Sequence, residues 1–259
     1  MKRLLFVLAL TSCAHPMPRT TLDVENPRLL NAFFGLDDAL PGSAFWLCAQ
    51  APGRDGMPIT FSRRVTQEPA PAAFTVTTRS GVKKTPLCVT PRPANEASEN
   101  HTLLLIGDLG SVDDPPAQVE VTGALALEAG GQAQGLSVEV TPLEAGPTLV
   151  LALGYAPGDL DSDCPKTTQQ VVVVAWAGGV HLVGGATRET HRQMYRVATE
   201  RGEVMPLALG DLDDQDNYVH LCLDTNAPAA RVSASAGVLL DPRDDVNPET
   251  SVAVEAALH

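Results

Sequence analysis

The sequence is poor in aromatic residues and in positive charge. Phe, Trp and Tyr make up 4% of its 259 residues, and 18 Lys and Arg stand against 31 Asp and Glu, for a formal net charge of -13. Phosphate groups repel such an acidic chain, so nucleic acid is not an expected partner. Hydrophobic residues still make up 44% of the chain, which is enough to bury a sizeable core and excludes wholesale disorder.

Long hydrophobic runs are also missing. No segment approaches the roughly 18 uninterrupted apolar residues that a transmembrane helix needs. The chain begins with the positively charged Met1-Lys2-Arg3, followed by the apolar run LLFVLAL at positions 4–10. That run is too short to span a bilayer but is typical of the hydrophobic region of a signal peptide.

The end of this run resembles the lipobox of bacterial lipoproteins. The matching residues are Leu10-Thr11-Ser12-Cys13. The resemblance implies cleavage before Cys13 once its thiol carries lipid, which leaves residues 1–12 as signal peptide and 13–25 as lipidated cysteine and tether. Ala14 rather than Asp follows, similar to Gram-negative lipoproteins sent to the outer membrane, so we expect a membrane partner through this anchor. The alternative is an ordinary secretory signal with an incidental cysteine.

The other four cysteines fit an exported protein. They are Cys48, Cys88, Cys164 and Cys222, and they form no CxxC motif and have no nearby histidine pair, so zinc has little support. Disulfides are the default in an oxidising compartment. Of the three connectivities, we favour Cys48–Cys88 and Cys164–Cys222, because each pair then falls within one expected domain. Buried free thiols are the alternative.

Short runs with alternating apolar and polar residues predict an all-β fold. Alternation is clear in Phe74-Thr75-Val76-Thr77 and in two VEVT repeats, at 119–122 and 138–141. Three more continuously apolar runs are typical of strands buried on both faces: HTLLLI at 101–106, TLVLAL at 148–153 and QVVVVAW at 170–176. Residues 231–239 and 251–255 supply candidate closing strands.

The spacing of the turn signals favours two β-sandwich domains in tandem. We place the domains at residues 26–146 and 147–259, with the boundary at Gly146-Pro147. One continuous sandwich of longer strands is the alternative. Asn26 and Pro27 are a typical N-cap and first residue of a helix, which predicts a short helix with Leu29, Leu30, Phe33 and Phe34 on it. An irregular segment packed across the end of a sheet is the other interpretation.

Part of the first expected domain resembles bacterial Ig-like domains. The residues that carry the resemblance are Met57–Val65 (MPITFSRRV) and Ala73–Gly81 (AFTVTTRSG). The similarity covers residues 57–125 and implies a sandwich that acts as a spacer, an adhesion unit or a binding domain. Cys48 and Cys88 depart from the pattern of that family, as does the short Pro-rich gap between the two motifs.

Acidic loops are the strongest candidate for a ligand site. In one loop Asp159, Asp161 and Asp163 occupy alternate positions, and Asp211, Asp213 and Asp216 belong to a denser loop. Alternate carboxylates in a tight loop suit a cation that prefers oxygen ligands, so calcium is the one cofactor that we consider. The alternative is that Asp and Gly serve as turn residues that keep strand edges soluble.

Signatures of catalysis are missing from the sequence. It contains no GxSxG, HExxH, P-loop or GxGxxG motif. Ser80-Gly81-Val82-Lys83 matches SxxK, but Gly81 follows an expected strand and predicts a hairpin tip. His220 is expected beside Tyr218 and Cys222 in a structural role, and Trp46 and Trp176 are expected in the core.

The sequence therefore predicts a lipid-anchored envelope protein that acts as a non-catalytic binding, adhesion or structural module. Its partner would be another envelope protein or an extracellular ligand. The alternatives are an envelope-facing hydrolase with an Asp/His site built from loops, and a calcium-stabilised spacer. An open pocket that held His181, His191 or His220 with two carboxylates would favour the hydrolase, whereas buried and separate histidines would favour the module.

Overall fold

The structure is a computed structural model that describes residues 26–212 and 216–257. The expected signal peptide, Cys13 and Asp213 lie outside the described residues. In chain order the first elements are β1 (Leu29–Ala32), η1 (Gly42–Trp46), β2 (Asp55–Phe61), η2 (Pro71–Ala73), β3 (Phe74–Thr78), β4 (Lys83–Lys84), β5 (Cys88–Thr90), β6 (Thr102–Gly107), β7 (Pro116–Val121), η3 (Glu128–Gly130) and β8 (Ser137–Glu139).

The second half of the chain continues the same pattern. Its elements are β9 (Leu149–Tyr155), β10 (Gln170–Trp176), β11 (His181–Leu182), α1 (Arg188–Gln193), β12 (Tyr195–Thr199), β13 (Gly202–Val204), β14 (Ala208–Gly210), β15 (Tyr218–Leu223), β16 (Ala229–Ala234), β17 (Leu239–Leu240), β18 (Thr250–Ala253) and β19 (Glu255–Ala256). Strands dominate throughout, which confirms the all-β fold class. None of the helices in the described part is long and apolar enough to cross a membrane.

The first sheet pair consists of the sheets β1-β2-β6-β5 and β4-β3-β7-β8. Their facing sides enclose one core, to which β2 contributes Met57, Ile59 and Phe61 and β3 contributes Phe74 and Val76. The burial of β3 alternates along the strand, as the sequence predicts. The two sheets therefore pack as a sandwich because each has one apolar face.

The second sheet pair consists of β14-β15-β10-β9-β19 and β13-β12-β16-β18. Strand β10 pairs antiparallel with β15, from Gln170 opposite Leu223 to Ala175 opposite Tyr218. Strand β19 is different, because it adds to β9 in parallel. The core between these sheets includes Trp176, which is fully buried as expected.

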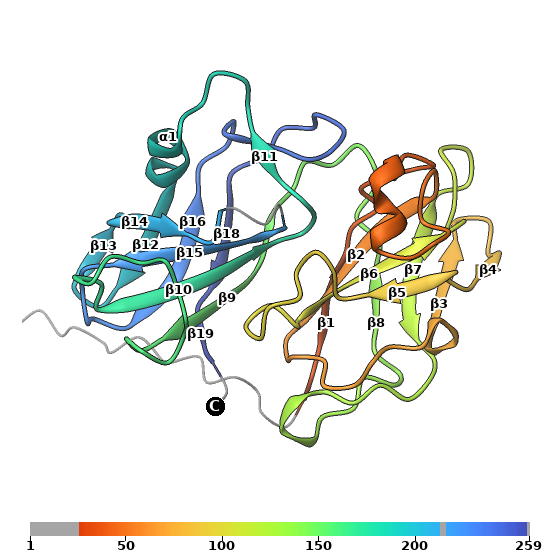
Figure 1. Ribbon diagram of the computed structural model, residues 1–259, viewed down its shortest axis with the longest axis horizontal. Helices are drawn as coiled ribbons and strands as arrows, with labels where there is room; N and C mark the ends of the chain where they lie inside the picture. Colours follow the sequence, from red (N-terminus) through yellow and green to blue (C-terminus); the bar gives the residue numbers. More distant parts are fainter. Residues whose placement is uncertain (1–25, 213–215, 258–259) are drawn as a thin grey trace, which may run out of the picture.

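The two sheet pairs lie side by side and share a junction (Figure 1). There the outer face of β9, β10 and β15 packs with Leu30 and Ala94 of the first sheet pair. Strand β10 is thus buried on both faces, since Val172 and Val174 face the inner core while Val171 and Val173 face the junction. This confirms the expectation drawn from the continuous apolar run QVVVVAW.

Both disulfides form as expected. Cys48 after η1 is bonded to Cys88 at the start of β5, and Cys164 in the loop between β9 and β10 is bonded to Cys222 of β15. Each bond joins residues on the same side of Gly146-Pro147. The division into two domains at that point remains a prediction.

The prediction of a short N-terminal helix is wrong, because residues 29–32 form the strand β1. Strand β1 pairs antiparallel with β2 along the edge of the sheet. Leu29 packs into the first core, and Leu30 packs against the apolar residues at the junction of the two sheet pairs. Pairing and burial on two sides therefore override the local helix signal of Asn26 and Pro27.

The expectation that Trp46 lies in the core is also wrong. It lies at the end of η1, outside any strand, with 72% of its surface exposed. The helix α1 was not expected at all. It begins after Thr187, which forms a capping box with Thr190, a signal that the sequence contains.

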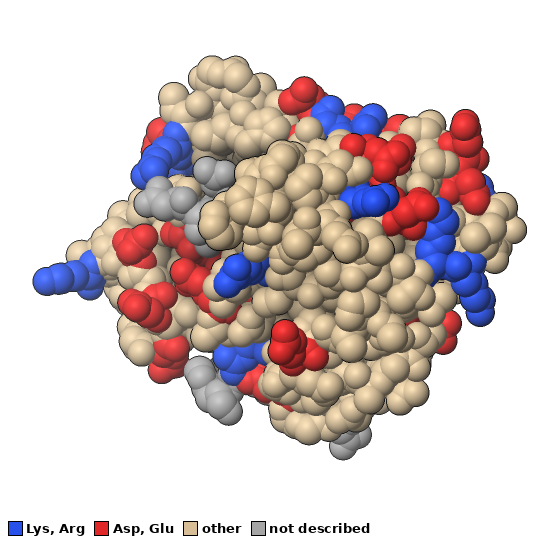
Figure 2. Space-filling model, turned by 45° about the vertical axis from the view of Figure 1, so that its right-hand side comes forward, with Lys and Arg blue, Asp and Glu red and all other residues tan. Residues whose placement is uncertain are grey.

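Charges on the surface are mixed. Figure 2 shows acidic and basic side chains scattered over the face that it draws, with broad areas between them that carry neither Lys or Arg nor Asp or Glu. Several of the basic groups pair with acidic ones, as Lys84 does with Asp108 and Arg28 with Glu255.

Gly146 at the predicted boundary is expected to tolerate no side chain. A Cβ atom there would overlap the carbonyl oxygen of Val246 and lie 2.7 Å from its carbonyl carbon. Backbone atoms cannot move aside as a flexible side chain can, so Gly146→Ala should lower the free energy of unfolding by about 3 kcal/mol. Denaturant unfolding measures this. Gly179→Ala is the control, since nothing lies within 4 Å of a Cβ there. Equal stability of the two variants would contradict the packing described.

Candidate functional site

An acidic cluster lies at the junction of the two sheet pairs. We call Glu96, Glu99, Asp211, Asp216 and His220 the junction cluster. Glu96 and Glu99 belong to the segment between β5 and β6, whereas the other three lie just after β14 or on and just before β15. Carboxylate oxygens of Glu96, Glu99 and Asp211 lie within 4.8 Å of one another. The fold therefore brings together acidic groups that are far apart in the chain.

Glu99 is the most deeply placed member. It has 0% exposed surface and sits in the turn that leads into β6, where its N–H donates to the carbonyl oxygen of Glu96. The Glu96 N–H in turn donates to Oε2 of Glu99 at 3.1 Å. Burial, together with the nearby carboxylates of Asp216 and Asp211, raises the pKa of Glu99 to about 10.

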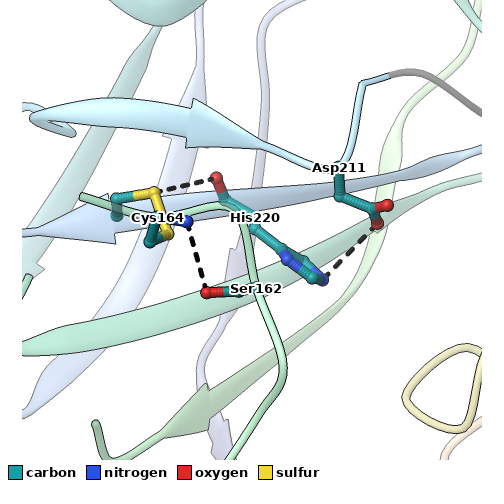
Figure 3. The surroundings of a disulfide bond; sticks show 5 residues. Ser162, Cys164, Asp211 and His220 are labelled. Carbon is teal, nitrogen blue, oxygen red and sulfur yellow. Dashed lines mark hydrogen bonds and ion pairs between the residues drawn. A yellow bond between two sulfur atoms is a disulfide. The ribbon is translucent and has the colours of Figure 1, made fainter. Parts of the chain in front are cut away.

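His220 faces the cluster from the middle of β15. Its side chain points toward Asp211 in Figure 3, and its Nε2 lies 3.4 Å from Oδ2 of Asp211. His220 is 2% exposed. It lies on β15 two residues before Cys222, which forms the disulfide with Cys164. Asp211 has a positive φ of 60°, a conformation that Asp tolerates better than most residues. Asp216 accepts a hydrogen bond from the Tyr218 N–H at 2.7 Å.

Uncharged hydrogen bonds cross the junction beside the cluster. The hydroxyl groups of Thr102 on β6 and Tyr218 on β15 lie 2.8 Å apart. Burial raises the pKa of the Tyr218 hydroxyl well above its usual value. The Asn31 amide of β1 donates to the carbonyl oxygen of Ala177 at 3.1 Å. These contacts fix how the two sheet pairs meet.

The structure places the two expected calcium loops in different surroundings. Asp159, Asp161 and Asp163 are exposed and belong to no cluster of potential metal ligands in the part of the chain that is described. Asp211 and Asp216 do come together, but with glutamates of the other sheet pair rather than within one loop. Glu96 and Glu99 were not singled out from the sequence, because two glutamates three residues apart give no sign of burial.

A second acidic group has a structural explanation. Carboxylate oxygens of Asp37, Asp38 and Asp55 lie close together. Both oxygens of the buried Asp55 accept backbone hydrogen bonds, Oδ1 from Asp38 and Oδ2 from Leu109 and Gly110. Burial raises the pKa of Asp55, and the backbone donors oppose this shift. Asp55 therefore ties two loops to the start of β2.

The other three histidines of the described residues are separate from one another. His101 is buried beside the carbonyl oxygen of Phe61 and His191 beside the Tyr195 hydroxyl, at 3.1 and 3.2 Å. Burial lowers the pKa of each to about 4. His181 is exposed, 3.6 Å from Asp244. Ser80 lies at a turn, as expected, with its hydroxyl donating to Asp114.

An open groove of about 560 Å³ lies on the first sheet pair, and its lining includes Ala97 and Asn100 from the segment that also carries Glu96 and Glu99. Its lining includes Thr66, Gln67 and Asn100 together with the ion pair of Arg64 and Glu128. Arg64 also donates to the carbonyl oxygen of Ala97. The groove offers polar groups for binding, but none of its lining residues is a histidine, a cysteine or a serine.

No protein-family model matches the chain, and neither the curated proteins nor the solved structures include one with significant similarity to it. The arguments about function therefore depend on the residues of this chain alone.

His191 predicts how stability depends on pH. Its pKa of about 4 in the folded state lies below the ordinary value of 6.5, so between these values only the unfolded chain binds the proton. This contribution to stability is present above pH 6.5 and is lost as the pH falls through 4. His191→Gln removes this titrating group. The unfolding free energy of the variant should therefore fall by about 3 kcal/mol less than that of the native chain between about pH 6.5 and pH 4.

Denaturant unfolding from pH 7 to pH 4 measures this difference. Gln193→Ala on the exposed side of the same helix is the control and should keep the slope of the native chain. Parallel profiles for the native chain and His191→Gln would show that the histidine is protonated equally in both states.

Proposed function

We propose that the protein is a lipid-anchored protein of the bacterial outer membrane whose folded part acts as a non-catalytic binding, adhesion or structural module. The lipobox-like sequence ending in Cys13 suggests the anchor. Two disulfides support an oxidising compartment, where such bonds persist. The sandwich-like sheets are compatible with the modules that the Ig-like resemblance implies.

The observation that carries the proposal is the burial of the titratable groups. His220 and Glu99 are buried where the two sheet pairs meet. His101 is buried beside Phe61 of the first sheet pair and His191 beside Tyr195 of the second. A hydrolase would need a histidine and two carboxylates that a substrate can reach. Neither the groove beside Arg64 nor the cavity lined by Ser233, Glu249, Thr250 and Ser251 contains a histidine. The buried, separate histidines therefore favour the module over the hydrolase.

Binding by such a module would use exposed surface. The groove beside Arg64 offers amide and hydroxyl groups. The exposed rings of Phe45 and Trp46, whose centroids are 4.7 Å apart, offer apolar area near the disulfide of Cys48. We propose an envelope protein or an extracellular ligand as the partner, without nucleic acid.

The lipid anchor is tested by Cys13→Ser, with the chain exported by its own signal in a Gram-negative host. The native chain should fractionate with membranes, and its intact mass should equal the chain from Cys13 with added acyl groups and two disulfides. Cys13→Ser should lack the lipid and leave the membrane fraction, because acyl chains hold a protein at about 0.8 kcal/mol per buried CH₂. Met17→Leu in the expected tether is the control. A native chain without added lipid mass, whose Cys13→Ser variant still sediments with membranes, would refute the anchor.

A further inference from the structure

Glu99 differs from the other fully buried acidic side chain of the first sheet pair. Asp55 satisfies both of its oxygens with backbone N–H groups, as described above. Only Oε2 of Glu99 receives a backbone hydrogen bond, from Glu96. Its Oε1 is buried and receives no hydrogen bond from an N–H or hydroxyl group of the described residues, and the side chain that Glu99 meets is the carboxyl group of Asp211. Two ionised carboxyl groups in contact in a buried place repel each other, so either a proton or a cation has to lie between them.

The other side chains around Glu99 are acidic as well. The side chains that act on Glu99 electrostatically are the carboxylates of Asp216 and Asp211. Glu96 adds a third carboxylate from the side of Glu99. Without a bound ion, a proton on Glu99, whose pKa is raised to about 10, lets these acids lie close together. A cation between them would displace that proton and keep the carboxylates ionised.

The distances fit a cation of the size of calcium. Ca²⁺ binds oxygen ligands at about 2.3–2.6 Å, so two of its ligands are at most about 5 Å apart. The oxygens of Glu96, Glu99 and Asp211 lie within 4.8 Å of one another.

We propose that the junction cluster binds one divalent cation of the calcium type, with Glu99 and Asp211 as ligands from opposite sheet pairs and Glu96 as a third. The site differs from the single-loop calcium sites that the sequence suggests, because its ligands come from two separate parts of the fold. The ion would act as a bridge between the sheet pairs, beside the contact of Thr102 with Tyr218. The proposal does not depend on the lipid anchor.

Such a bridge links ion binding to folding. The unfolded chain does not hold Glu99 and Asp211 together, so the ion binds the folded state selectively and stabilises it. At a calcium concentration of about 100 times the dissociation constant, the midpoint of thermal unfolding should rise by about 5 to 10 °C.

The test uses the full chain after treatment with EDTA and removal of the chelator. Titration calorimetry with Ca²⁺ alone should give one ion per chain, and Glu99→Gln should weaken binding at least tenfold and abolish the rise in the melting midpoint. Glu203→Gln, which removes an exposed glutamate on β13, in the sheet that does not contain β14 and β15, should bind like the native chain. Parallel titrations with Mg²⁺ and Zn²⁺ define the class of ion.

A second variant and a second measurement cover the case in which Glu99→Gln fails to fold. Asp211→Asn should weaken binding in the same way. Tb³⁺, which replaces Ca²⁺ at oxygen sites, should luminesce when tyrosine is excited, and Tyr218→Phe should dim this signal because that ring borders the cluster.

Three results would overturn the proposal. The first is the absence of saturable Ca²⁺ binding at millimolar concentration, and the second is binding that neither Glu99→Gln nor Asp211→Asn weakens. The third is binding of Zn²⁺ alone that depends on His220, which would replace the oxygen site by one with a nitrogen ligand.

Discussion

The structure depends on the burial of the β9–β10–β15 sheet on both faces. Its inner face completes the core around Trp176, and its outer face carries Val171, Val173 and Tyr218 into the junction. A sheet with two apolar faces must be covered twice. Leu30 and Ala94 of the first sheet pair contribute to the second cover, so hydrophobic burial holds the two sheet pairs together.

Polar groups at the edge of this apolar contact have to be matched where they become buried. Thr102 meets Tyr218, and the Asn31 side chain meets the carbonyl oxygen of Ala177. Glu99 is different, because it enters the junction as a carboxyl group that faces other carboxyl groups. A proton or a cation can compensate for that arrangement, and this is why the junction is the most informative place in the molecule.

Local patterns predicted much of the fold for identifiable reasons. The alternation in Phe74–Thr78 reports one buried face, and the continuous run in Gln170–Trp176 reports two. The cysteine pairing followed from grouping each pair within one stretch of strands. These signals succeed because side-chain periodicity and chain proximity are properties of short segments.

Other features could not be read locally. The helix signal at Asn26 and Pro27 was outweighed when Leu29–Ala32 found a partner strand in β2, and Trp46 was left exposed because its short helix lies on the surface. For the candidate site, the sequence indicated Asp211 and Asp216 but not Glu99. Nothing in a sequence states that a glutamate between two strands will meet acidic residues more than 100 positions later in the chain.

The sequence by itself determined the acidic charge, the all-β class and the cysteines available for disulfides, because composition and periodicity act over short distances. Only the tertiary structure decided that Glu99 and Asp211 meet, since their contact arises when two sheet pairs cover the same apolar face. The position of the carboxylates is therefore a consequence of hydrophobic packing and not of any local motif.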